Sequence, residues 1–257
     1  MNQEERRIVL LGKTGVGKSA TGNTILGRRN AFTSKQSFNS VTKHSERAEA
    51  VIGGKRVRVV DTPGFFDTRS LSQGQLAEEL CRSVKLSQDG VHAFILVFKF
   101  GPFTKQEEEI ITKLKKAFGQ KVLDHTILLF THGDGVGEEE IDQAVRGNKS
   151  LQRALDQCGE RFYFINNSAL NNRDQVTELL QKIDRMVQQN GGRFYTNEMY
   201  KKAQSLTLNE LWEKCKKCFF MIIDILTQRL SPLTELVLRL LSRFSQREES
   251  EHLLHMD

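Results

Sequence analysis

Eight consecutive residues near the N-terminus have the types and spacing of a phosphate-binding loop. They are Gly12, Lys13, Thr14, Gly15, Val16, Gly17, Lys18 and Ser19, and they match the pattern G-x-x-x-x-G-K-[ST]. In such a loop glycines let backbone N–H groups turn toward phosphate oxygens, the lysine reaches the β and γ oxygens, and the serine holds Mg²⁺. The sequence therefore predicts that these residues and Ala20 bind a polyphosphate, with Lys18 also serving catalysis.

A second motif, Asp61-Thr62-Pro63-Gly64, follows a predicted strand. This placement puts the Asp61 carboxylate near the metal ion, where it acts through a water molecule, and a backbone N–H of Gly64 near a γ-phosphate. Between the two motifs, Thr42 lies in a polar connection and could complete the Mg²⁺ shell when a triphosphate is bound. A solvated loop hydroxyl is the alternative for Thr42.

Two further loops have residues suited to a nucleotide base. Asp134 follows another predicted strand, and its carboxylate can accept protons from N1 and the exocyclic amine of guanine, a donor pair that adenine lacks. Such a bidentate contact favours guanine by about 1–3 kcal/mol. Thr131 and His132 precede Asp134, and stacking of His132 on the base is one interpretation. Asn166 and Asn167 would approach the base from the other side, although an Asn pair also suits an ordinary turn.

The composition limits which classes of ligand and which cellular compartment suit the chain. The chain has 257 residues, 38% of them hydrophobic and 27% charged, which indicates a folded globular protein. Residues 1–60 hold twelve lysines and arginines against four glutamates, so this quarter carries +8 while the whole chain carries +6. Its only aromatic side chains are Phe32 and Phe38, so a polyphosphate suits it better than nucleic acid. Neither a secretory segment nor a membrane span is expected, and four cysteines form no disulfide framework, so we expect a cytoplasmic protein.

Strand and helix patterns alternate along most of the chain. Strands are predicted at residues 6–11, 48–52, 56–60, 92–98, 126–130 and 162–165, and helices at 18–26, 73–86, 104–118 and 173–189, with a polar helical stretch before the last strand. Gly53-Gly54 predicts a tight hairpin turn. We therefore expect an α/β fold with a mostly parallel six-stranded sheet, one antiparallel strand, and helices on both faces. In such sheets ligands bind at the carboxyl ends of the strands.

The pattern changes after Gly191-Gly192, where we place a domain boundary between residues 1–191 and a helical extension at 192–257. Apolar residues in the extension recur at spacings of four and three, and Ser231-Pro232 suits the start of a second helix. These helices could pack on the first domain, pair with another chain or lie on a membrane. Packing on the first domain is the favoured interpretation.

These motifs together resemble the GIMAP family, the GTPases of immunity-associated proteins, in the septin-like and chloroplast-import-receptor-like branch of P-loop GTPases. The resemblance covers about residues 6–189, and it includes the segment from Gly90 to Val97 that leads into Gly101-Pro102-Phe103-Thr104. It implies GTP/GDP and Mg²⁺ as ligands, Thr42 and Asp61 in the two switches, and Ser34 near the nucleotide. It also implies nucleotide-dependent dimers or filaments with related GTPases, often at intracellular membranes.

Hydrolysis is expected to be slow. Many GTPases place a water-orienting glutamine after the glycine of D-x-x-G, where this chain has Phe65. The resemblance implies an arginine presented across a dimer, and this chain has Pro102 at that place. We therefore expect a slow GTPase that needs dimerisation or a partner. Two alternatives are a competent enzyme that uses Arg69 and a scaffold whose nucleotide is permanently bound.

Overall fold

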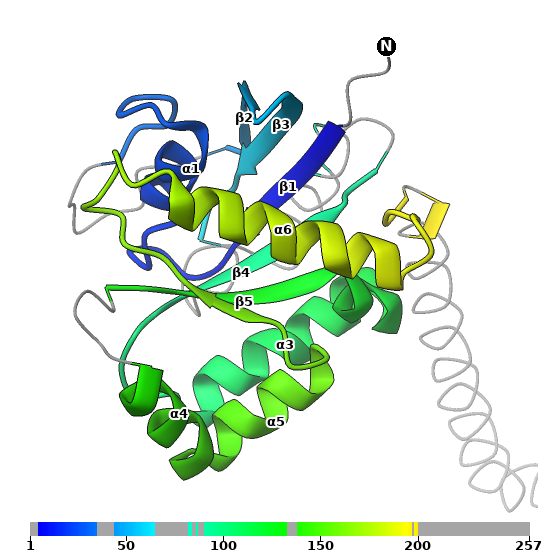
Figure 1. Cartoon of the computed structure of the whole chain (residues 1–257). Helices are drawn as coiled ribbons and strands as arrows, with labels where there is room; N and C mark the ends of the chain where they lie inside the picture. The colour runs from blue at the N-terminus through cyan, green and yellow to red at the C-terminus, as the bar shows by residue number, and fades with distance from the viewer. Residues whose placement is uncertain are drawn as a thin grey trace, which may run out of the picture. The chain divides into compact units, whose positions relative to one another are not determined.

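The computed structural model describes residues 5–34, 44–64, 82–83, 86, 90–132, 138–196 and 198–199 (Figure 1). Its strands are β1 (Glu5–Leu11), β2 (Glu46–Ile52), β3 (Lys55–Asp61), β4 (Ala93–Lys99), β5 (Thr126–Thr131) and β6 (Phe162–Phe164). Its helices are α1 (Lys18–Leu26), α3 (Lys105–Phe118), η1 (Gln120–His125, a 3-10 helix), α4 (Glu138–Gly147), α5 (Lys149–Gln157) and α6 (Asp174–Gln189). Where a range was predicted, these bounds match it to within two residues, whereas η1 was not predicted. Most of the predicted helix at 73–86 and all of 200–257 lie outside the described residues.

The strands form one sheet in the order β2-β3-β1-β4-β5-β6. All neighbours pair in parallel except β2 and β3, which are joined by a hairpin. Gly53 and Gly54 at its turn have φ angles of 56° and 79°, which residues with a Cβ rarely adopt. The predicted six-stranded sheet with one antiparallel strand is therefore confirmed.

The central strands are buried on both faces, and their side chains alternate between two apolar cores. In β4, Phe94, Leu96 and Phe98 enter one core, while Ala93, Ile95 and Val97 enter the other. The first core is closed by α3 and α5, and the second by α1 and α6, which lie on opposite faces of the sheet (Figure 1). Because β1 lies between β3 and β4, the loops after β1 and β3 meet at the carboxyl edge of the sheet.

The segment that follows α6 packs on the start of β4. Tyr195 is fully buried, forms an antiparallel bridge with Val91, and donates its hydroxyl proton to the Phe118 carbonyl. A Cβ on Gly90 would come within 2.5 Å of the Phe194 ring, so the segment lies directly over this glycine. The chain divides into two compact units, Met1–Gln204 and Ser205–Asp257. The boundary that we placed between residues 191 and 192 stays a prediction. Within the part of the chain that the structure describes, no helix is long and apolar enough to cross a membrane.

The Asp184 carboxylate joins α6 to the amino ends of β1 and β3. Asp184 accepts hydrogen bonds from Arg6 of β1 and Lys55 of β3, each at 2.5 Å. Burial acts to raise the pKa of Asp184, but the hydrogen bonds from Lys55 and Arg6 outweigh it and hold the pKa below its ordinary value. The folded chain therefore favours the charged form of this side chain.

We expect Asp184→Asn to lower the free energy of unfolding at neutral pH by about 1 kcal/mol, because the pair is partly exposed to solvent. The pKa is lowered on folding, so the stabilisation is complete above the ordinary carboxyl value of 3.8 and is lost as the pH falls through the lowered pKa. Urea unfolding at pH 7 and at pH 3 measures this difference. Arg185→Ala, on the exposed neighbour, is the control and should show no such pH dependence.

Candidate nucleotide-binding site

The loop between β1 and α1 has the backbone geometry of an anion-binding cradle. Gly15 and Gly17 have φ angles of 79° and 95°, and α1 begins directly after Gly17. Gly12 has a φ of 150°, and a Cβ at this position would lie 2.5 Å from the Val97 carbonyl oxygen. Only glycine lets the loop leave β1 so close to β4 and then present N–H groups at a helix N-terminus. The predicted phosphate loop therefore has the required shape.

Two lysines of the loop have different surroundings. Lys18 is buried, and its Nζ donates to the carbonyl oxygens of Gly12 and Lys13 at 3.2 and 2.8 Å. Lys13 instead donates to Glu107 of α3 at 2.7 Å. Burial acts to raise the pKa of Glu107, but hydrogen bonds from Lys13 and Thr104 outweigh it and lower the pKa. The positive charge of Lys18 thus lies within the loop, whereas Lys13 joins the loop to α3.

The metal-holding residues predicted from two separate motifs lie in contact. Ser19 Oγ, in the first turn of α1, donates to Asp61 Oδ2, at the end of β3, at 2.6 Å. Thr62 holds the next segment in place by donating to the Leu10 carbonyl at 2.6 Å. A hydroxyl and a carboxylate are hard oxygen donors of the kind that Mg²⁺ takes together with substrate phosphates. Among the residues described, no three or more His, Cys, Asp or Glu side chains form a metal-binding group. The donor set therefore fits Mg²⁺ bound jointly with a phosphate.

The carboxyl end of β5 lies against the same loop. Thr131 is buried, and its hydroxyl donates to the Val16 carbonyl at 2.7 Å. A Cβ on Gly17 would lie 3.4 Å from the Thr131 side chain and 3.5 Å from Asn167 Nδ2. The residues predicted to serve the phosphates and those predicted to serve the base are thus brought together around Gly17.

The two asparagines after β6 bind protein groups. Asn166 Oδ1 accepts hydrogen bonds from the backbone N–H groups of Ser168 and Ala169 at 2.8 and 3.1 Å, which is an Asx turn. Asn167 reaches α1, where it contacts Thr21 and Thr24. The turn that we weighed as the alternative for this pair is therefore present at Asn166.

The remaining predicted residues differ in their placement. Ala20 lies in the first turn of α1, Ser34 is exposed after it, and Gly64 is buried directly after β3. His132 is exposed at the end of β5 and has a φ of 58°. Residues outside the described part of the chain are Thr42, Asp134, Phe65 and Arg69.

A hollow of about 450 Å³ adjoins the loop. It is lined by Lys13 and Val16 of the loop, by residues 97–102 and by Glu107 and Ile110 of α3. Pro102 is exposed at this hollow, whereas Phe103 is buried and Thr104 caps α3. The segment in which the family resemblance implies an arginine therefore lies beside the phosphate loop.

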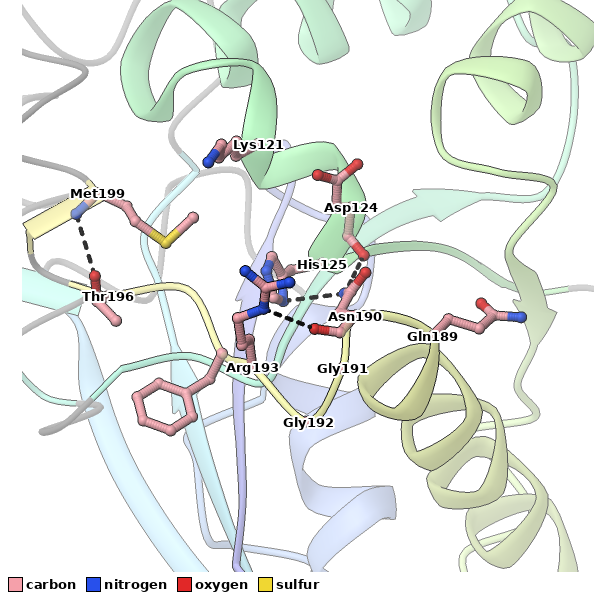
Figure 2. A pocket seen from close by; sticks show the side chains of 11 residues that line it. Lys121, Asp124, His125, Gln189, Asn190, Gly191, Gly192, Arg193, Thr196 and Met199 are labelled. Atoms are coloured by element: carbon pink, nitrogen blue, oxygen red, sulfur yellow. Dashed lines mark hydrogen bonds between the residues drawn. The ribbon is translucent and has the colours of Figure 1, made fainter.

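A larger hollow of about 700 Å³ lies at the opposite end of the sheet (Figure 2). His125 precedes β5, and Gly191 and Gly192 follow α6, so this hollow faces the amino ends of the strands. Asn190 closes one side by donating to the Asp124 carbonyl at 2.8 Å (Figure 2). The C-terminus of α6 presents carbonyl groups with partial negative charge, which disfavour an anion. The loop after β1 therefore remains the candidate phosphate site.

Comparison with known proteins decides the family. The model of the AIG1 family matches residues 6–215. The chain belongs to the AIG1 family. Immune-associated nucleotide-binding protein 9 of Arabidopsis thaliana is 36% identical over 208 residues, which cover 78% of this chain and 60% of that protein. GTPase IMAP family member 8 of Homo sapiens is 34% identical over 196 residues, which cover 75% of this chain and 29% of that protein. The AIG1-family chain thus spans about 60% or less of the length of these two relatives.

Solved structures share its fold. Toc33 from Arabidopsis thaliana in complex with Mg²⁺ and GMPPNP superposes with a TM-score of 0.56 at 15% identity, covering 73% of this chain and 86% of that one. Toc33 in complex with GDP and Mg²⁺ gives a TM-score of 0.54 at 16% identity, covering 72% and 85%. The fold of this AIG1-family chain is therefore that of a P-loop GTPase, as predicted.

Several polar side chains around the site make contacts that sequence reasoning did not predict. They are those of Glu107, Thr21, Thr24, Arg173 and Gln175. Arg173 is the N-cap of α6, and the others belong to helices in which polar residues are common. A helix pattern shows which face is polar, but it does not show which loop lies against that face.

We expect Gly12→Ala to destabilise the folded chain by roughly 1–3 kcal/mol, because the new Cβ meets the Val97 backbone and the positive φ strains alanine. Denaturant unfolding without nucleotide measures the change. Gly147→Ala is the matched control, since no atom lies within 4 Å of its Cβ position. Equal stability of the two variants would contradict the close approach of the loop to β4.

Proposed function

We propose that this chain is a guanine-nucleotide-binding protein that switches between GTP- and GDP-bound states with Mg²⁺ and hydrolyses GTP slowly. One observation carries the proposal: the Ser19 hydroxyl and the Asp61 carboxylate, from separate motifs, meet at 2.6 Å beside the glycine loop that opens α1. The relatives, named as a nucleotide-binding protein and a GTPase, support it. So do the Toc33 structures with GDP or GMPPNP and Mg²⁺.

Each part of the site has a proposed task. The N–H groups of residues 12–18 bind phosphate oxygens, and the N-terminus of α1 adds a favourable dipole. Lys18 supplies positive charge for the β- and γ-phosphates, and Ser19 and Asp61 are the protein ligands for Mg²⁺, Asp61 through water. When bound, Mg²⁺ neutralises charge on the phosphate oxygens. Thr42 would complete the Mg²⁺ shell when a triphosphate is bound, the Gly64 N–H would lie near the γ-phosphate, and Ser34 would lie near the nucleotide.

Guanine selectivity is assigned to the loops after β5 and β6. Asp134 accepts from N1 and the exocyclic amine of guanine, and Thr131 and His132 support that loop. Asn166 and Asn167 belong to the loop on the other side of the base. Support comes from Thr131 and Asn167, which both lie within about 3.5 Å of the Cβ position of Gly17 and so border the phosphate loop.

Slow GTP hydrolysis is expected from the residues at positions 65 and 102. A phenyl ring at Phe65 cannot hold the attacking water by hydrogen bonds, and Pro102 cannot act as an arginine finger, which contributes about 10³–10⁵ in rate. We therefore propose that dimerisation with a related GTPase across the nucleotide face is the output of GTP binding. For the chloroplast translocon components atToc33 and psToc159, dimerization is important for the GTPase activity. A nucleotide-loaded scaffold without turnover is the alternative function.

The proposal includes a division of the chain into two domains. Residues 1–191 would form the GTP-binding domain and residues 192–257 a helical extension. On the family resemblance, the protein would act in the cytoplasm, with peripheral contact at the cytosolic face of intracellular membranes.

We expect GDP with Mg²⁺ to bind the wild-type chain and Lys18→Ala to weaken that binding by roughly ten- to a hundredfold, the effect of losing a charged hydrogen bond. Isothermal titration calorimetry measures both affinities. Lys121→Ala, which removes a lysine at the opposite end of the sheet, is the control and should bind as the wild type does. Equal affinity of the Lys18 variant, or no heat with the wild type, would refute the proposal.

We expect the full chain to shift toward a dimer with a non-hydrolysable GTP analogue but not with GDP, and to hydrolyse GTP far more slowly than once per second without a partner. Sedimentation velocity and a phosphate-release assay measure the two properties. A monomer in both nucleotide states would favour the scaffold. GTP turnover at several per second would contradict the expectation of slow hydrolysis from Phe65 and Pro102. A large fall in that turnover rate in Arg69→Ala would assign the activity to Arg69.

A further inference from the structure

The side-chain amide of Asn167 lies between two threonines of α1. The Thr24 hydroxyl donates to Asn167 Oδ1 at 2.9 Å, and Asn167 Nδ2 donates to Thr21 Oγ1 at 3.2 Å. The Thr24 hydroxyl also lies 3.0 Å from the Ala20 carbonyl. Thr21 and Thr24 are three positions apart and share one buried face of the helix. One amide therefore forms hydrogen bonds with two threonines of α1 that lie three residues apart.

A second side chain from the same region binds the end of the same helix. The Arg173 guanidinium donates to the carbonyl oxygens of Thr24 and Ile25 at 2.6 and 2.8 Å. The last carbonyls of a helix have no partners within it and carry partial negative charge, so a guanidinium is a favourable cap. Asn167 and Arg173 thus attach the segment before α6 to the middle and the end of α1.

The loop between these two residues is braced from within. Gln175, which is buried, donates to the carbonyl oxygens of Asn166 and Ala169 at 3.1 and 3.0 Å, and accepts from the Asn166 N–H at 3.0 Å. The Asx turn at Asn166 adds two more hydrogen bonds inside the loop. Residues 166–175 therefore form a stiff piece of backbone fixed to α1 at two places.

The attachment of residues 166–175 to α1 affects nucleotide binding because α1 starts at the phosphate loop. Lys18 and Ser19 form the first turn of α1, and Thr21 and Thr24 lie in the turns that follow. The helix is thus a common support for the phosphate end of the site and for the loop after β6. A shift of that loop relative to α1 would change the distance between the parts that bind phosphate and base.

We infer that Asn167 is a positioning residue that sets guanine-nucleotide affinity by fixing the loop at 166–175 to α1 through Thr21 and Thr24, without touching the nucleotide. The inference rests on the proposed function and adds to it a role for Asn167 within the protein. It replaces direct base contact by Asn167 with a contact between two parts of the protein. Each end of its amide makes one hydrogen bond to α1, the oxygen accepting from Thr24 and the nitrogen donating to Thr21.

A double-mutant cycle on the full chain tests this. Asn167→Ala and Thr24→Val each remove one side of the contact, and each should speed release of a fluorescent GDP analogue by roughly two- to tenfold. The double variant should release GDP no faster than the faster single variant, because both changes break the same contact. Rates that multiply in the double variant, or an unchanged rate in Thr24→Val, would overturn the inference.

Affinity for two nucleotides separates positioning from a general loss of structure. Misplacing the base-side loop should weaken GDP binding while leaving the weak affinity for ADP, measured by competition, unchanged. An equal loss for both nucleotides would overturn the inference. Thr177→Val is the control, since this exposed hydroxyl of α6 bonds within its own helix to the Arg173 carbonyl. If thermal melting shows that Thr24→Val does not fold, Thr21→Val takes its place in the cycle with the same expected result.

The outcome for the wild-type chain distinguishes this inference from the proposed function. A wild-type chain that binds no guanine nucleotide overturns both. A wild-type chain that binds GDP, together with independent effects of the two substitutions, overturns the positioning role alone and leaves the proposed function standing.

Discussion

The hydrogen bond from Ser19 to Asp61 joins the first turn of α1 to the end of β3, and the site depends on it. Two constraints bring these residues together. Gly12 lets the chain leave β1 so close to β4 that a Cβ at this position would lie 2.5 Å from the Val97 carbonyl oxygen, and Thr62 holds the segment after β3 against β1. β1 lies between β3 and β4, so both constraints act at the carboxyl edge of the sheet. The parallel order of the strands, which the two apolar cores stabilise, therefore determines where a phosphate could bind.

Most of the fold could be predicted because its signals are local. Each central strand is a short apolar run, each long helix has a repeating apolar face, and Gly53-Gly54 permits one kind of turn. The phosphate loop was predictable for the same reason, since its eight residues are contiguous. The segment around Tyr195 carried no such signal. We assigned it to the helical extension, and only the fold shows that the Tyr195 ring packs against Phe94 and Phe118.

Asn166 and Asn167 show why the site was harder to predict than the fold. An asparagine side chain can bind a base, close a turn or join two segments, and its type does not distinguish these uses. Asn166 closes a turn, and Asn167 joins its loop to α1, because Thr21 and Thr24 face it across a gap of more than 140 residues in the chain. Likewise Lys13, a loop residue expected at the phosphates, is paired with Glu107 of α3.

Binding and hydrolysis make different demands on such a site. Binding needs donors held in fixed places, and the described residues supply them on two supports, the sheet edge and α1, which are linked through Ser19 and Asn167. Hydrolysis further needs a group that orients the attacking water and a positive charge, such as an arginine, that stabilises the transition state. On the proposed function and the family resemblance, such groups would stand at Phe65 and Pro102, neither of which has a side-chain donor. On the proposed function, this chain is therefore built to hold its nucleotide, and the rate of hydrolysis depends on what a second protein adds.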